Sequence, residues 1–149
     1  MSDRIERFVG PYAFLSNFYP CEFVWDDIVW KHSEGAYQAA KTLERDGRLI
    51  MSRIHKPGET KALGKRITLR EDWNEVKDGI MLDIVRAKFR QNLDLAQKLV
   101  DTGDAVLEEG NYWNDRYWGV CPAGSVHGQN KLGKILMIVR EELKQGDNQ

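Results

Sequence analysis

The segment from Ser33 to Lys41 constrains this chain most, because it predicts a short helix with all of its chemistry on one side. At about 100° per residue, four side chains share an arc of roughly 100°: Glu34, Tyr37, Gln38 and Lys41. The opposite face, which suits packing against a core, carries Ala36, Ala40 and Leu43. A carboxylate and an amine therefore stand two turns apart on one face, where they can form a wall of a reaction site.

The same pattern also fits an ordinary solvated helix face. Ser33 is a favourable N-cap, and Glu34 and Lys41 near opposite ends complement the helix dipole. Most polar faces of amphipathic helices simply contact water. A functional interpretation of this helix therefore depends on a second cluster elsewhere in the chain.

Length, composition and charge limit the possible classes of protein. The 149 residues, 42% of them hydrophobic, indicate one globular domain over residues 1–149. The 22 Lys and Arg against 23 Asp and Glu, a net charge of −1, argue against binding nucleic acid through a large uniform basic surface. Because there is neither an apolar run of about 20 residues nor an apolar core near the N-terminus, we expect a cytoplasmic protein without membrane contact.

Cysteine and histidine usage argues against a metal site. Cys21 and Cys121 are expected to be reduced, and the three histidines show no metal-ligand spacing. His32-Ser33-Glu34 matches the H-x-E half of the zinc nucleoside deaminases, but the second half of that signature, P-C-x-x-C, is missing. We therefore expect no metal and no cofactor.

Hydrophobic patterning indicates an α+β fold, a single helix-dominated domain with a few short strands. Residues 21–25 and 28–30 alternate as the strands of a hairpin around a turn at Asp26-Asp27. A further short strand is expected at 105–109. Helices are expected over residues 33–41, 46–54, 59–64, 72–92, 93–100 and 130–144.

The second cluster lies in residues 112–119, where four of eight positions are aromatic. Such aromatics can fill a core, or they can form a stacking surface for a flat heterocycle with Asp115 beside it. Residues 124–128 then lead into the last helix near Asn130, whose first amides are candidate donors to a ligand phosphate, although the loop also fits an ordinary connection.

Residues 61–70 carry four basic side chains, which either contact a diphosphate or a nucleic-acid backbone or form a solvated helix face. These are Lys61, Lys65, Arg66 and Arg70.

Taken together, these segments resemble the NADAR family of YbiA-like proteins. The shared motifs run in family order from residue 14 to about residue 140. They are Leu15-Ser16-Asn17-Phe18, Trp30, Ser33-Glu34, residues 37–41, Asp115, Tyr117-Trp118-Gly119, Gly128, residues 130–133 and Leu136-Met137. Two features depart from the family pattern: Gly35 replaces an expected histidine, and the loop at 120–127 is longer and poorer in glycine. Both departures bear on substrate identity more than on reaction type.

The resemblance implies an N-glycosidase that cleaves the bond between ribose C1′ and a nitrogen. Family members act on phosphorylated ribosylamino-pyrimidine intermediates of riboflavin biosynthesis or remove ADP-ribose from guanine in DNA. The expected partner is a small phosphorylated ribosyl or ADP-ribosyl substrate, or ADP-ribosylated DNA. Both substrate classes stay open at this point.

Three side chains are candidates for catalysis. Cleavage builds positive charge on the sugar, which the Glu34 carboxylate can stabilise while activating water. Lys41 can attack C1′ and form an imine-type adduct if its pKa is lowered, or it can contact a phosphate or pair with Glu34. Asp115 is expected to orient the ribose hydroxyls or act as a second acid or base.

The resemblance also marks ten positions for substrate binding, with Trp118 expected to stack on the base. They are Ser16, Asn17, Phe18, Trp30, Tyr37, Gln38, Trp118, Gly119, Gly128 and Asn130. We expect Glu34 and Lys41 to share one cavity with the tryptophan-rich loop. The alternative function is a non-catalytic module for ADP-ribose or NAD, which would not need the pair of Glu34 and Lys41.

Overall fold

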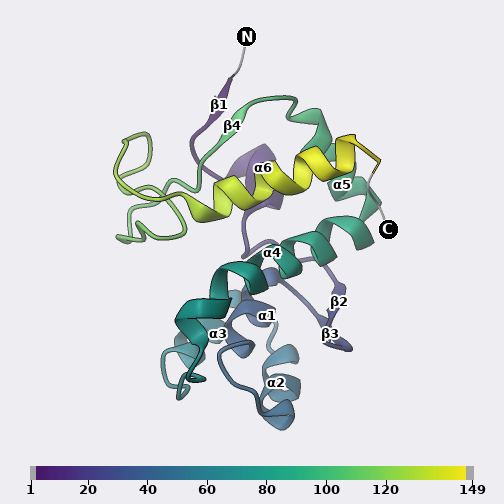
Figure 1. Ribbon diagram of the computed structural model, residues 1–149, viewed down its shortest axis with the longest axis vertical. Helices are drawn as coiled ribbons and strands as arrows, with labels where there is room; N and C mark the ends of the chain where they lie inside the picture. Colours follow the sequence, from purple (N-terminus) through teal and green to yellow (C-terminus); the bar gives the residue numbers. More distant parts are fainter. Residues whose placement is uncertain (1–2, 147–149) are drawn as a thin grey trace. The chain divides into compact units, whose positions relative to one another are not determined.

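A computed structural model describes residues 3–146, and over that range the chain forms seven helices and four short strands (Figure 1). This confirms the predicted helix-dominated α+β class. The elements fall into two compact units, residues 17–92 and a second unit made of residues 3–16 and 93–146. Within residues 3–146, no helix is both long and apolar enough to cross a membrane. The organisation into one domain over residues 1–149 stays a prediction.

The unit of residues 17–92 begins with the predicted hairpin of β2 (Phe23–Trp25) and β3 (Ile28–Trp30), which pair antiparallel. Asp26 and Asp27 both have positive φ, 58° and 57°. Two consecutive residues of this kind are typical of the tight turn that matches the twist of a hairpin, and Asp tolerates the left-handed region better than most residues do. The alternation of the two strands turns Phe23, Ile28 and Trp30 inward.

Four helices complete this unit: α1 (Ser33–Ala39), α2 (Arg45–Ser52), α3 (Pro57–Gly64) and α4 (Trp73–Gln91). Each was predicted to within a few residues. Helix α1 lies among α2, α3 and α4 and packs against all three (Figure 1). Ala36 and Ala40 are fully buried as expected, but Leu43 is 68% exposed, because the chain has left the helix by that point.

The second unit combines the N-terminal segment with the segment that follows residue 92. β1 (Arg4–Ile5) pairs parallel with β4 (Val106–Leu107), and its helices are η1 (Gly10–Leu15), α5 (Leu93–Asp101) and α6 (Lys131–Lys144). Helix α6 packs against α5 and β4. Its buried stripe contains Leu132, Ile135, Leu136 and Val139.

Candidate active site

Helix α1 is buried, which excludes the interpretation of its polar side as a solvated helix face. All seven of its residues are buried. The N-cap is His32, whose Nδ1 accepts a hydrogen bond from the Gly35 amide at 2.9 Å, so Ser33 is the first helical residue rather than the cap. The other ring nitrogen, Nε2, lies 3.1 Å from the Ile54 carbonyl oxygen and must donate to it. Burial lowers the pKa of His32, which favours this neutral ring.

The Glu34 carboxylate is held by its helical neighbour Gln38. The Gln38 amide donates from Nε2 to Glu34 Oε2 at 2.6 Å, and both residues are more than nine-tenths buried. Gln38 in turn lies against Gly64, the last residue of α3, where an added Cβ would come within 1.9 Å of Gln38 Oε1. Glycine at position 64 therefore leaves the space in which Gln38 holds Glu34.

Lys41 follows α1 in a turn, and its amide donates to the Gln38 carbonyl at 3.2 Å. Its Nζ lies 6.0 Å from the centroid of the Tyr37 ring. Burial lowers the pKa of Lys41, and the Glu34 carboxylate opposes that shift. Three positive charges lower the pKa of Lys41 further, those of Lys61, Lys65 and Lys77. Both effects that lower the pKa increase the fraction of the neutral amine, the nucleophilic form.

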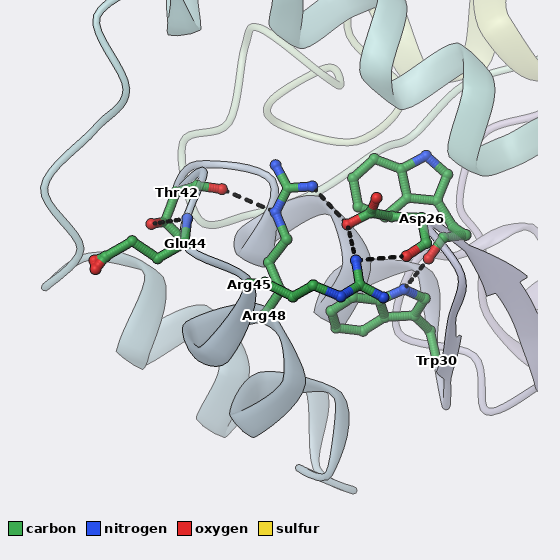
Figure 2. A network of polar contacts seen from close by, with 7 residues as sticks. Asp26, Trp30, Thr42, Glu44, Arg45 and Arg48 are labelled. Carbon is green, nitrogen blue, oxygen red and sulfur yellow. Dashed lines mark hydrogen bonds and ion pairs between the residues drawn. The ribbon is translucent and has the colours of Figure 1, made fainter.

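The backbone around Lys41 is fixed from two sides. The Arg70 amide donates to the Lys41 carbonyl at 2.9 Å. Arg48 donates from Nε to the Thr42 carbonyl at 2.9 Å and from Nη1 to Asp26 Oδ2 at 2.8 Å (Figure 2). Because Asp26 is in the hairpin turn, this network ties the turn after α1 to the hairpin.

Three other candidate residues of the same unit lie in α1 or just before the hairpin. Asn17 accepts the Glu34 amide with its carbonyl at 2.9 Å. Phe18 is 41% exposed, and Lys61 Nζ lies 5.8 Å from its ring centroid. Tyr37 packs on Trp73 with ring centroids 5.3 Å apart.

Trp30 packs in the core, and Ser16 ends a helix. Trp30 has no exposed surface, and its indole N–H donates to the Trp25 carbonyl at 2.9 Å. The Trp30 side chain therefore serves the core, and its contact with substrate stays a prediction. Ser16, in the second unit, is the half-buried C-cap residue of η1, and its amide donates to the Ala13 carbonyl at 2.9 Å.

In the second unit, the aromatic segment is organised by the fully buried Asn111. Its Oδ1 accepts the Asp115 amide at 3.1 Å, and its Nδ2 donates to the Asp115 carbonyl at 2.9 Å and to Glu109 Oε2 at 3.0 Å. Asp115 Oδ1 then accepts the amides of Tyr117 at 3.1 Å and Trp118 at 2.9 Å. The Asp115 carboxylate therefore shapes the turn that carries Trp118.

The remaining candidates of this unit occupy close backbone crossings. An added Cβ would lie 1.9 Å from Glu109 Oε2 at Gly119 and 2.2 Å from the Gly119 carbonyl oxygen at Gly128. Gly128 also has a φ of 149°. Asn130 donates to the Leu107 carbonyl at 2.9 Å and accepts the Glu109 amide at 3.0 Å. Packing and backbone pairing therefore account for all three residues.

The start of α6 is occupied by the protein itself. The Lys131 amide donates to the Tyr117 carbonyl at 3.2 Å, and the Leu132 amide donates to the Trp118 carbonyl at 2.9 Å. Of the two alternatives for this loop, these bonds favour the ordinary connection over a phosphate site at the first two amides. They fasten the aromatic loop to the helix instead.

Sequence reasoning missed His32, Gly64 and Asn111. His32 precedes a Ser-Glu pair that looks like a helix start, so only the fold identifies the cap. A glycine near a helix end usually reads as a terminator, which hides the contact of Gly64 with Gln38. An asparagine in an irregular segment is a recognisable signal for local backbone hydrogen bonds, and Asn111 fits that signal.

The described part of the chain offers no metal-ligand group. Among residues 3–146, no three His, Cys, Asp or Glu side chains are placed to hold an ion. Both ring nitrogens of His32 are engaged in hydrogen bonds, so the half-motif shared with the deaminases has no free ligand at its histidine.

Comparison with known proteins identifies close relatives. Residues 6–144 match the model of the NADAR domain. N-glycosidase Npun_R5314 of Nostoc punctiforme is 41% identical over 139 residues, which cover 90% of this chain and 87% of that protein. N-glycosidase YbiA of Escherichia coli is 35% identical over 148 residues, which cover 96% of this chain and 91% of that protein.

A longer relative and a solved structure add to this comparison. Riboflavin biosynthesis protein VVA0006 of Vibrio vulnificus is 38% identical over 136 residues, 90% of this chain. The chain spans about a third of that protein, 36% of its length. The NMR structure of E. coli YbiA matches with a TM-score of 0.84 and 34% identity, over 99% of this chain and 89% of that one.

Proposed function

Because this chain belongs to the NADAR family and is a YbiA-type N-glycosidase, we propose that it cleaves the bond between C1′ of a phosphorylated ribose and a nitrogen. The substrate class is a ribosylamino-pyrimidine phosphate of riboflavin biosynthesis. The name of the Vibrio vulnificus relative supports this class, and the net charge of −1 favours a small molecule over a long nucleic acid. ADP-ribosylated guanine is the comparison substrate.

One observation carries the proposed mechanism: Lys41 is half-buried directly after the helix that holds the buried Glu34 carboxylate. This burial lowers the pKa of the Lys41 amine, and the Glu34 carboxylate opposes the shift. The neutral amine of Lys41 attacks C1′. The C1′–N bond breaks, its electron pair leaves with the base nitrogen, and that nitrogen takes up a proton. Lys41 Nζ loses a proton, so charge balances across the exchange.

The second half of the reaction frees the enzyme. Opening of the sugar ring converts the Lys41 adduct to an imine, and water adds to C1′ and releases the ribose as its aldehyde. Glu34 stabilises the positive charge on C1′ in the first half and removes a proton from water in the second. The hydrogen bond from Gln38 keeps the carboxylate oriented for both.

Borohydride reduction tests the lysine. With substrate present, it should fix a ribose adduct on Lys41, located by peptide mapping, while Lys41→Arg should give none. Lys56→Arg is the control, since Lys56 is exposed at the N-cap of α3, the opposite end of that helix from Gly64. An adduct on another residue, or turnover without any adduct, would remove Lys41 from the role of nucleophile.

Glu34→Gln tests the carboxylate. The amide keeps the size of the side chain but cannot accept a proton, so kcat should fall by about 10²- to 10⁴-fold with the fold intact. Wild-type rates would exclude Glu34. Incubation of the wild-type protein with both substrate classes, followed for release of free base, ranks the substrates, and binding without release would instead support the non-catalytic module.

Asp115 and Trp118 are proposed to act on the base side of the substrate. Trp118 stacks on the base, and Asp115 acts as a positioning residue because its carboxylate fixes the Trp118 amide. Asp115→Ala should therefore raise KM more than it lowers kcat, and Asp115→Asn, which keeps an acceptor oxygen, should restore most of the binding. A loss confined to kcat would indicate direct acid or base catalysis by Asp115.

A further inference from the structure

Four lysines of the unit of residues 17–92 converge at the end of α1. Tyr37 and Trp73 pack with their ring centroids 5.3 Å apart. One turn beyond each ring, on the same side of its backbone, stands a lysine: Lys41 after Tyr37, and Lys77 after Trp73 in α4. The contact between the two rings therefore brings Lys41 and Lys77 to the same region.

Helix α3 brings two more lysines to this region. Gly64 touches Gln38, one turn before Lys41. Lys61 precedes Gly64 by three residues, and Lys65 directly follows it. Lys61 and Lys65 are four residues apart, so they share one side of α3, and Lys61 Nζ lies 5.8 Å from the centroid of the partly exposed Phe18 ring.

Electrostatics agree with this placement. The charges of Lys61, Lys65 and Lys77 all lower the pKa of Lys41, in agreement with the placement that the packing gives them. Residues 60–70 contain four basic side chains, of which Arg70 pairs with Asp72, with Nε 2.6 Å from Oδ1. A phosphate dianion in this region is attracted by the positive charge of each lysine.

The first two amides of α6 do not offer a phosphate anchor, since they donate to the carbonyls of Tyr117 and Trp118. We propose that Lys61, Lys65 and Lys77 form a phosphate subsite, which binds the phosphate ester or diphosphate on C5 of the ribose and so places C1′ beside Lys41. This inference rests on the proposed function for its sugar. Its recognition chemistry, three ammonium groups for one dianionic group, stands on the geometry of the cluster.

Direct binding to the full chain tests the subsite. Titration calorimetry with ribose 5-phosphate, and separately with ADP-ribose, gives the affinity of the monoester and of the diphosphate. Single changes of Lys61, Lys65 and Lys77 to Gln should each weaken binding of the preferred compound about tenfold. Lys56→Gln, which removes the same charge from the exposed N-cap position of α3, should change it less than about twofold.

Unphosphorylated ribose distinguishes the outcomes. It should bind weakly and equally to all variants, and a urea titration should show that the variants are folded. Unchanged binding of both phosphorylated probes in the three variants, or no binding by the wild-type chain, overturns the subsite even if base release and borohydride trapping proceed. Loss of probe binding in the variants supports the subsite even if no base is released, in which case only the proposed reaction fails.

Discussion

Gly64→Ala is the sharpest test of how α1 presents its carboxylate. The added methyl group would lie 1.9 Å from Gln38 Oε1 and 2.6 Å from Gln38 Cδ, both in the amide group at the end of that side chain. The Gln38 amide group must therefore move by about 1 Å or more, because real contacts of this kind are not shorter than 3.0 Å. Gln38 Cβ would lie 3.2 Å away and needs to shift by only a few tenths of an ångström, so most of the displacement falls on the amide group and we expect its hydrogen bond to Glu34 to break.

The expected cost follows from that bond. A buried hydrogen bond to a charged group contributes roughly 1.5–3 kcal/mol, and replacing a helical glycine by alanine returns about 0.4–1 kcal/mol. Gly64→Ala should thus lower the free energy of unfolding by about 1–2 kcal/mol. It should also lower kcat by about tenfold or more, because Glu34 loses its orienting partner.

Urea denaturation and base-release kinetics measure the two effects, with Gly79→Ala as the matched control. Gly79 lies inside α4 with nothing within 4 Å of an added Cβ, so its replacement should raise stability by about 0.4–1 kcal/mol and leave kcat unchanged. In a Gln38→Ala background, Gly64→Ala should lose most of its cost, because the displaced amide is gone. A Gly64→Ala protein as stable and as active as Gly79→Ala would refute the reasoning.

Three further changes probe the surrounding structure. Lys88 is fully buried, and burial lowers its pKa to about 8. Between pH 8 and 10.5 the unfolded chain keeps the proton that the folded chain has lost, so the free energy of unfolding should rise by about 3 kcal/mol over this interval. Urea titrations at several pH values should show this rise in the wild-type protein and not in Lys88→Met. Arg48→Met removes the hydrogen bonds that tie the turn after α1 to the hairpin and should cost about 1.5–3 kcal/mol in the same assay, whereas Arg53→Met, at an exposed position, should stay within about 0.5 kcal/mol. Asn111→Ala removes the hydrogen bonds to the amides of Trp113 and Asp115 and to the Asp115 carbonyl, and should cost about 2–4 kcal/mol, with a change in tryptophan fluorescence of the loop.

The secondary structure was readable from the sequence because it depends on local signals. The hairpin follows from strand alternation around Asp26-Asp27, and the stripe of α6 follows from helical spacing. β1 was missed, since a strand of two residues is too short to show any alternation. Its existence depends on a partner, β4, about a hundred residues away.

The burial of α1 was beyond the sequence for a related reason. Ser33, Glu34 and Gln38 are polar, and local pattern assigns polar residues to water. They are buried because other segments approach them: α3 at Gly64 and the carbonyl of Asn17 at the Glu34 amide. Such long-range partners leave no periodic trace.

The aromatic loop shows a different ambiguity. Its aspartate and glycines looked like ligand groups, but most of their contacts satisfy the backbone of an irregular segment. Such a segment has no ladder or helix to pair its amides, so side chains such as Asn111 and Asp115 must do so. The same residue types suit both tasks, and composition alone cannot tell them apart.

The two proposals combine into one electrostatic argument about Lys41. In the free enzyme, burial and the neighbouring lysines lower its pKa and favour the amine that attacks, while Glu34 opposes them. A phosphate bound by Lys61, Lys65 and Lys77 offsets their charges, so these lysines no longer lower the pKa of Lys41 and the Glu34 carboxylate has a larger share in setting it. That balance favours a positive charge on Nζ, and the protonated imine is the form to which water adds most readily. Because the phosphate binds before Lys41 attacks and stays on the sugar, burial is then the main effect that favours the neutral amine, and the offset charges favour hydrolysis of the adduct.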